Sequence, residues 1–382
     1  MSTPDLTFER LSEGRSNNFD ILRLALAVLV VLNHSYGLLL GPSAPEPMVV
    51  LTRGQVGFGD LAVDFFFVIS GFLITASWIN SRSLPRFLSK RIARIYPGIA
   101  VAILFCLIVV APLGANHPAE YLHGLSPMTY LRSLAELSIP GQSEVFSNQA
   151  YPGILNLPLW TIRYEFLCYL MVAGFGLAGF LRKPFIILLF FLAALTAYSW
   201  QSLAGGLPML DWRIYPILGR MQAWPRFLTF YIAGMVCYLY RGGIPLRRSY
   251  LWISAAAVAL SIRTGLALTL PVLGTYLLMC AASNQAIRFP SFGKRGDFSY
   301  GMYIYACPVQ QLLIRYFQPH LTPLTLFLFS LIITLPLAAA SWRFIESPCL
   351  RLIQTRRKQE RAPSFGDFRL PGGASCAESG KG

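Results

Sequence analysis

Charged side chains are scarce in this sequence. Asp, Glu, Lys and Arg make up 13% of its 382 residues, whereas soluble domains carry about 25%. The hydrophobic residues reach 55%, and only 17 acidic residues stand against 32 Lys and Arg. This composition argues against a soluble globular enzyme and against a disordered chain. In so apolar a chain, the basic excess indicates membrane orientation, and no nucleic-acid partner is predicted.

Cysteine patterns that would hold a metal or a disulfide framework are also lacking. The seven cysteines are scattered, mostly within apolar runs, and none belongs to a Cys-x-x-Cys pair or a Cys/His cluster. We therefore expect no metal site and no disulfide scaffold. No repeat of fixed period, heptad pattern or cleavable signal sequence is apparent, and the first apolar run is too long for a signal peptide.

Long apolar runs dominate what is present. A helix that crosses the bilayer core, about 30 Å thick, needs roughly 20 apolar residues. The sequence predicts an all-α, polytopic membrane bundle of about ten transmembrane helices. The two runs on either side of Arg263 are the weakest, so residues 249–286 form either two spans or one span with a re-entrant segment. The runs are centred near Leu29, Phe67, Leu104, Tyr169, Leu192, Ala233, Ala257, Leu277, Cys307 and Ile332.

Basic residues determine the predicted orientation. Most Lys and Arg residues fall in alternate loops on the side of the N-terminus, and the positive-inside rule places this side in the cytoplasm. An even number of spans then puts both termini in the cytoplasm. We predict a cytoplasmic N-terminal segment over residues 1–17, a transmembrane domain over 18–354 and a disordered cytoplasmic tail over 355–382.

Ionisable side chains inside the spans need an explanation, because each costs at least about 2.5–3.5 kcal/mol to insert. Arg23 and His34 of the first span are 11 residues apart. They therefore share one helix face, about 16 Å apart along the axis. Asp64 of the second span and Glu165 of the fourth are predicted at the depth of His34. A histidine level with carboxylates is what proton abstraction needs, and we prefer this interpretation to a structural hydrogen bond.

Two structural alternatives remain open for these charges. Asp20 and Arg23 are spaced i,i+3 near the inner surface, a pair that could serve only to orient the helix end. Arg163 and Glu165 could form a structural pair, although residues two apart do not face each other on a helix.

A basic segment follows the second span. Lys90, Arg91 and Arg94 are spaced to lie within about one helical turn. They would form a compact cationic cluster that pairs with phosphates from the cytoplasm. The cluster indicates a phosphorylated cytosolic ligand such as a nucleotide or coenzyme A. For Arg82 and Arg86 in the same segment, anchoring to anionic lipid is the preferred interpretation.

Six segments, taken in order, resemble motifs of the acyltransferase-3 family of integral membrane acyltransferases, which includes bacterial O-acetylases of surface polysaccharides. Singly each is weak, but together they run from about residue 17 to 348. Many relatives carry a histidine two positions before the proline of the fifth segment, where this chain has Ala306. His34 is therefore the favoured histidine for a chemical role. The segments are NNFDILRLALAVLVVLNHS, VDFFFVISGFLI, KRIARIYP, LPLWTIRYEF, FSYGMYIYACPV and WRFIESP.

The resemblance implies transfer of an acetyl or another short acyl group from acyl-CoA, at the cytoplasmic side of the inner membrane, to a hydroxyl of a glycan or lipid-linked saccharide outside. Lys90, Arg91 and Arg94 would hold the coenzyme phosphates, and the pantetheine arm would pass Ser70 and Gly71. Membrane lipid is the remaining expected partner. Acceptor specificity would lie in the outer loops near residues 41–57 and 112–156, and the acceptor and the oligomeric state stay open.

The same resemblance implies roles for the intramembrane charges. His34 would be the general base, with a carboxylate of Glu165 or Asp64 orienting the imidazole. An acyl-histidine intermediate is the second possibility. Arg23 would hold the coenzyme or a carboxylate. The alternative function is a polytopic carrier or flippase for a lipid-linked sugar or an ion, although no convincing inverted repeat is found.

Overall fold

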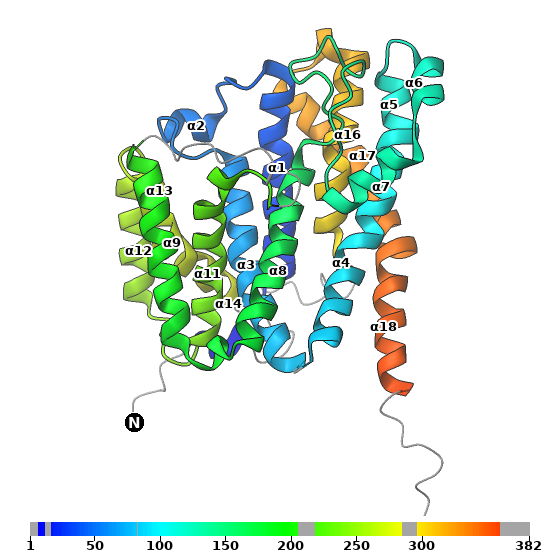
Figure 1. The fold of residues 1–382 in the computed structure, drawn as a ribbon. Coiled ribbons are helices and arrows are strands. Elements are labelled where there is room, and N and C mark those ends of the chain that lie inside the picture. The colour runs from blue at the N-terminus through cyan, green and yellow to red at the C-terminus, as the bar shows by residue number, and fades with distance from the viewer. Residues whose placement is uncertain (1–6, 12–16, 82, 205–217, 285–295, 360–382) are drawn as a thin grey trace, which may run out of the picture.

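The described part of the chain is a bundle of helices (Figure 1). The computed structural model describes residues 7–11, 17–81, 83–204, 218–284 and 296–359. Over these residues the only strand-like pairing is two isolated bridges, Thr7 with Pro245 and Ala115 with Val145. This confirms the predicted all-α class, and it follows from the need of a chain in lipid to satisfy its backbone hydrogen bonds within each helix.

The helices alternate in direction between two faces of the bundle. We call the face at which α1 (Phe19–Leu40) begins the proximal face, and the face at which it ends the distal face. Figure 1 shows α2 (Pro47–Leu51), α6 (Pro118–Gly124) and α13 (Leu266–Thr269) at the distal face, opposite the N-terminus. The main helices are α1, α3 (Phe58–Ser81), α4 (Leu84–Phe105), α8 (Trp160–Leu177), α9 (Pro184–Ala204), α11 (Trp224–Leu239), α12 (Arg248–Ser261), α14 (Thr275–Ser283), α16 (Phe298–Phe317), α17 (Pro323–Ser341) and α18 (Ser347–Gln359).

Six helical segments are long and apolar enough to cross a membrane. Four more predicted centres lie in α8, α11, α12 and α16, which fall short of that length or apolarity. The structure therefore supports a multi-pass membrane protein, while the total of about ten spans and the cytoplasmic termini stay predictions. The six segments are Phe19–Leu40, Phe58–Ser81, Leu84–Gly114, Pro184–Ala204, Leu266–Ser283 and Pro323–Ile353.

The region that the sequence left ambiguous contains two helical segments. The first is α12, and the second runs through α13, a π-helical turn η7 (Leu270–Gly274) and α14. A turn at residues 262–265 joins them, and Ser261 Oγ lies 2.7 Å from Thr269 Oγ1 across it. At the other end of the chain, α18 continues to Gln359, into the segment predicted as a tail, and residues 360–382 lie outside the described residues.

Two glycines bring α3 and α11 into backbone contact. A Cβ on Gly71 would lie 2.0 Å from the carbonyl oxygen of Tyr231, and a Cβ on Gly234 would lie 2.0 Å from that of Val68. Small residues allow such close crossings of membrane helices. Gly71 therefore faces α11 and does not line the cavity that Ser70 lines, and the predicted passage of a pantetheine arm beside these two residues stays a prediction.

The loop after α1 folds back onto the start of α3. Both carboxylate oxygens of Glu46 accept a hydrogen bond from the Phe58 backbone N–H at 3.2 Å. Burial raises the pKa of Glu46, and backbone donors to the carboxylate oppose that shift. Thr52 Oγ1 closes the loop by donating to the Val56 carbonyl at 2.9 Å. The loop is thus held in place over the distal face.

Candidate active site

A cavity of about 410 Å³ lies between α1, α3, α4, α8, α16 and α18. We call it the proximal cavity, because Arg23 near the start of α1 and the basic residues near the start of α4 line it. Arg23, Lys90, Arg91 and Arg94 all line this one cavity, together with Ser70. The structure therefore brings together all five residues that the sequence assigned to the donor. Arg82 lies outside the described residues, and Arg86 is not among the lining residues.

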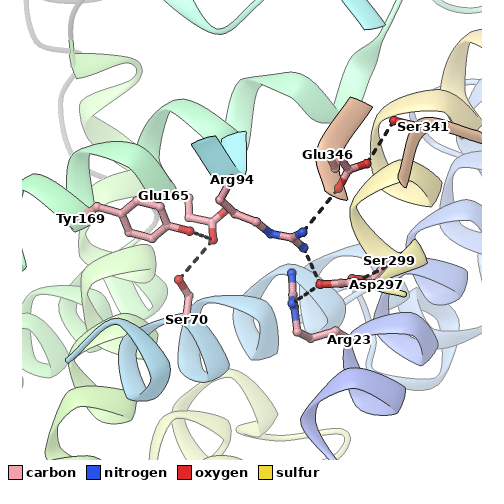
Figure 2. A network of polar contacts seen from close by, with 9 residues as sticks. All are labelled: Arg23, Ser70, Arg94, Glu165, Tyr169, Asp297, Ser299, Ser341 and Glu346. Carbon is pink, nitrogen blue, oxygen red and sulfur yellow. Dashed lines mark hydrogen bonds and ion pairs between the residues drawn. The ribbon is translucent and has the colours of Figure 1, made fainter. Parts of the chain in front are cut away.

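A network of ion pairs joins four helical segments at this cavity (Figure 2). Asp297, the N-cap of α16, accepts from Arg23 Nη1 at 2.5 Å and also pairs with Arg94 Nη2. Arg94 Nη1 lies 3.4 Å from Glu346 Oε2, in the π-helical turn η9 (Trp342–Glu346). Ser299 N–H and Oγ donate to Asp297 Oδ1 at 3.1 and 2.5 Å. Arg23 and Arg94 are therefore fixed in place by carboxylates from other segments.

Arg91 is held differently from Arg94. Its guanidinium lies 5.7 Å from the ring centre of Tyr169 and 6.0 Å from that of Phe87. Among the described residues, its buried Nε has no hydrogen-bond partner, and it forms no ion pair with a carboxylate. Lys90 Nζ donates to Ser81 Oγ at 2.8 Å. The cavity wall thus carries a half-buried guanidinium that lies near two aromatic rings and has no ion-paired carboxylate within the described parts of the chain.

Glu165 lies deeper in the same cavity. Its Oε1 accepts from Ser70 Oγ at 3.1 Å and from the Tyr169 hydroxyl at 2.5 Å (Figure 2). Two neutral donors hold this carboxylate in one orientation, so its position is set by α3 and α8 together. Thr161 and Tyr303, whose side-chain oxygens are 2.5 Å apart, line the wall near it.

Asp64 belongs to a second cavity, of about 820 Å³, which we call the distal cavity. Asp64 Oδ1 accepts from Arg226 Nε at 2.7 Å, and Arg226 Nη1 donates to Asp60 Oδ1 at 2.7 Å. Arg226 Nη2 also donates to the Asp60 carbonyl at 2.8 Å. One guanidinium from α11 therefore clamps two turns of α3.

His34 lines neither of these cavities. The residue is 9% exposed, and its Nδ1 has no hydrogen-bond partner among the described residues. It lies one helical turn beyond Val31, which is buried in the same cluster as Phe66 of the proximal cavity wall. Since Arg23 faces the proximal cavity, His34 continues that face of α1 toward the distal side, about 16 Å farther along the axis.

The structure places the two carboxylates of the predicted group, Glu165 and Asp64, in different cavities. Glu165 is bonded to Ser70 and Tyr169, while Asp64 is bonded to Arg226 in the other cavity. The position of a residue along a span sets its depth in the membrane, but it does not set which neighbouring helix its side chain faces. The catalytic roles assigned to His34, Glu165 and Asp64 stay predictions.

The two structural alternatives are resolved by tertiary partners. Arg23 pairs with Asp297 across the bundle, so it does not serve only an i,i+3 pair with Asp20. Arg163 Nε donates to the Glu136 carbonyl at 2.7 Å, and its Nη2 lies 3.7 Å from Glu136 Oε2, so Arg163 pairs with a residue of another helix.

Three charged residues of the two ion-pair networks were not predicted from the sequence: Asp297, Glu346 and Arg226. Asp297 directly precedes the FSYG segment, and an aspartate at the start of a helical run is a cap signal. Glu346 lies within the WRFIESP segment, but nothing local identifies Arg94 as its partner. Arg226 lies at the start of α11, a position that by sequence suggests an arginine at the membrane interface. Only the packing of α11 against α3 shows that it pairs with Asp60 and Asp64.

Comparison with known proteins identifies the family. The family model described as an acyltransferase domain, that of the acyltransferase-3 family, matches residues 16–343. The chain belongs to this family. It is 29% identical over 339 residues to an O-acetyl transferase of Shigella phage Sf6, an alignment that covers 87% of this chain and 95% of the relative. It is 28% identical over 370 residues to Nodulation protein 10 of Rhizobium leguminosarum bv. viciae, covering 89% and 95% of the two chains. No solved structure matches.

Family membership indicates which activity the helical bundle supports. Membership of the acyltransferase-3 family and similarity to an O-acetyl transferase support an O-acyltransferase activity. The six candidate spans indicate a membrane protein. The matched residues include α1, α3, α4, α8 and α16, which build the proximal cavity. Most of the cavity wall therefore lies within the matched residues, while α18, which also lines it, lies beyond residue 343.

Proposed function

We propose that the protein transfers an acetyl or other short acyl group from acyl-CoA, bound from the cytoplasm in the proximal cavity, to a hydroxyl of a glycan or lipid-linked saccharide at the outer side of the inner membrane. The observation that carries this proposal is the state of Arg91. Its Nε is buried without a hydrogen-bond partner among the described residues, and leaving a charged donor unsatisfied in this way is costly. A phosphate of the coenzyme supplies the missing anion.

The other basic residues complete the donor site. Lys90 is adjacent to Arg91 and lines the same cavity. Arg23 and Arg94 are already paired with Asp297 and Glu346, so they shape the mouth of the cavity and offer their remaining N–H groups to the coenzyme. The uncharged pantetheine arm extends along the apolar wall of α3, past Ser70, toward Glu165. Phosphates thus stay at the proximal end while the thioester reaches into the bundle.

The transfer step uses His34 as general base. The unpartnered imidazole nitrogen accepts the proton of the acceptor hydroxyl as that oxygen attacks the thioester carbonyl carbon. The carbon–sulfur bond breaks, the ester forms, and the thiolate of the leaving coenzyme takes the proton from the imidazolium. Glu165, fixed by Ser70 and Tyr169, stabilises the positive charge that develops during this step.

The donor site is tested by titrating acetyl-CoA into purified protein in detergent. We expect saturable binding that Arg91→Ala weakens roughly tenfold or more, since a hydrogen-bonded charge pair is worth about 1.5–3 kcal/mol. Arg86→Ala is the matched control, because Arg86 belongs to the same helix but does not line the cavity. Absence of saturable binding, or equal affinity of the two variants, would contradict the donor assignment and leave the carrier alternative in place.

A further inference from the structure

Two neighbouring cavities lie toward the distal face. The distal cavity, of about 820 Å³, and a third cavity of about 380 Å³ share two lining residues, Trp160 and Arg220. We call the two cavities together the distal groove. The Trp160 side chain at their junction is 40% exposed. Both outer loops contribute, through Gln55 on one side and Asn156 on the other. An exposed indole thus stands between two hollows large enough for sugar rings.

The charges of the distal cavity are unevenly satisfied. Arg226 forms ion pairs with both acidic residues of the cavity, Asp60 and Asp64. Arg53, Arg220 and Arg263 are exposed, and their guanidinium groups have no hydrogen-bond or ion-pair partner within the described parts of the chain. Because the acids are already paired, three unpaired cations remain along the groove. Its electrostatic complement is an anion.

The groove also offers partners for hydroxyl groups. Gln201 lines the distal cavity, and its Nε2 donates to the Gln222 carbonyl at 2.8 Å. Its Oε1 has no donor among the described residues, although it is buried. A carbonyl oxygen left without a donor in a polar hollow is satisfied by a hydroxyl or a water. An indole face, amide acceptors and guanidinium groups together suit a sugar that carries a charge.

The groove comes close to the donor site at one place. Phe67 lines the proximal cavity and Phe227 lines the distal cavity, and their rings are stacked with centroids 4.5 Å apart. The Trp160 ring lies 5.5 Å from that of Phe227. These two stacked rings therefore form part of the partition between the two cavities. A ligand resting on Trp160 lies next to this partition.

We propose that the distal groove is the acceptor site and that it takes a saccharide bearing a phosphate or carboxylate. The apolar face of a sugar ring packs on Trp160. Arg220, at the junction, and Arg53 and Arg263, along the distal cavity, pair with the anionic group. This inference rests on the proposed acyl transfer, because it assigns the second substrate of that reaction.

Acylation of surface glycans by cells with and without the gene is the first test. We expect the double variant Arg220→Gln/Arg263→Gln and the single variant Trp160→Leu each to lower the acylated fraction roughly tenfold. Their affinity for acetyl-CoA is expected to stay within about twofold of wild type, since neither change touches the proximal cavity. Arg315→Gln is the control, because this exposed arginine near the end of α16 does not line either cavity of the groove.

The outcomes separate the two proposals. Full acylation by both groove variants, with acetyl-CoA binding intact, overturns the acceptor site and leaves the proposed function standing. Absence of acetyl-CoA binding by the wild-type protein contradicts the proposed function itself.

Binding of defined probes to the purified protein tests the charge of the acceptor. Tetragalacturonate, a carboxylate-bearing tetrasaccharide, is compared with the neutral maltotetraose and with inorganic pyrophosphate. We expect an anionic probe to bind more tightly than maltotetraose, with an affinity that falls as salt is added and is lost in Arg220→Gln/Arg263→Gln. Binding of pyrophosphate but not tetragalacturonate identifies a phosphate-bearing saccharide. Equal affinity for the neutral probe, or no binding of either anion, overturns the proposal.

Discussion

The proximal cavity and the distal groove hold their charges in opposite ways. In the proximal cavity, Asp297 and Glu346 tie Arg23 and Arg94 together, and the four residues come from four different helical segments. In the distal groove, Arg226 forms ion pairs with Asp60 and Asp64, which lie on successive turns of α3. The other arginines of the groove lie on loops and turns. The first arrangement connects the bundle, while the second leaves cations exposed at its surface.

This difference follows from what each site binds in the proposed reaction. A coenzyme has one shape, so a site fixed by charges from several helices can be pre-organised for it. A saccharide acceptor is larger and more variable, and loops accommodate such variation without disturbing the packing beneath them. Helices α3 and α8 line both sites: on α3, Ser70 lines the proximal cavity and Asp64 the groove, and on α8, Glu165 lines the proximal cavity and Trp160 the groove.

His34 belongs to neither site, and its replacement has the largest expected effect. His34→Ala is expected to lower acyl transfer by about 10²–10⁴-fold, the usual contribution of a general base. The measurement is the acylated fraction of surface glycans. His34→Gln, which keeps a polar side chain of similar size, is expected to fail as well.

The protein level and the melting temperature of both variants should remain close to wild type, which separates chemistry from folding. Appreciable acyl transfer by His34→Ala would contradict the assignment of His34 as general base. Glu165 in the proximal cavity would then be the remaining candidate.

The two aspartates that share Arg226 provide the next comparison. Asp64 is 3% exposed and Asp60 is 49% exposed at the side chain. Asp64→Asn breaks a buried pair and is expected to destabilise the protein by about 3 kcal/mol. Asp60→Asn, which loosens an exposed pair with the same arginine, is expected to cost less than about 1 kcal/mol.

Thermal unfolding of both variants in the same detergent measures this difference. If Asp64→Asn instead lost activity at an unchanged melting temperature, Asp64 would act in catalysis and not as a structural clamp.

The smallest expected effect concerns the orientation of Glu165. Tyr169→Phe removes one of the two hydroxyl donors to its carboxylate. A neutral hydrogen bond contributes about 1 kcal/mol, so acyl transfer is expected to fall less than tenfold. Tyr316→Phe, which removes a hydroxyl bonded to the Leu113 carbonyl, is the control and should not change transfer. A loss as large as that of His34→Ala would assign Tyr169 a direct role in the chemistry.

The sequence predicted the proximal cavity better than the relation between the two sites. Apolar runs and basic spacing are local properties, so every predicted span centre lies in a helix and Lys90, Arg91 and Arg94 face one cavity with Arg23. The orientation of Asp64 depends on α11, which is 162 residues away at Arg226. Asp297 likewise meets Arg23 across 274 residues of chain. Such pairings follow from how helices pack, which hydropathy does not encode.

Transport of the acyl group from one face to the other is the central claim, and sealed membrane vesicles test it most directly. Labelled acetyl-CoA, which does not cross the membrane, is supplied to one face of vesicles that contain the protein and its glycan acceptor. We expect label in the glycan only when the coenzyme meets the proximal face, which the proposal places in the cytoplasm, and none with Arg91→Ala. Incorporation from the distal face, or equally from both faces, would contradict the account.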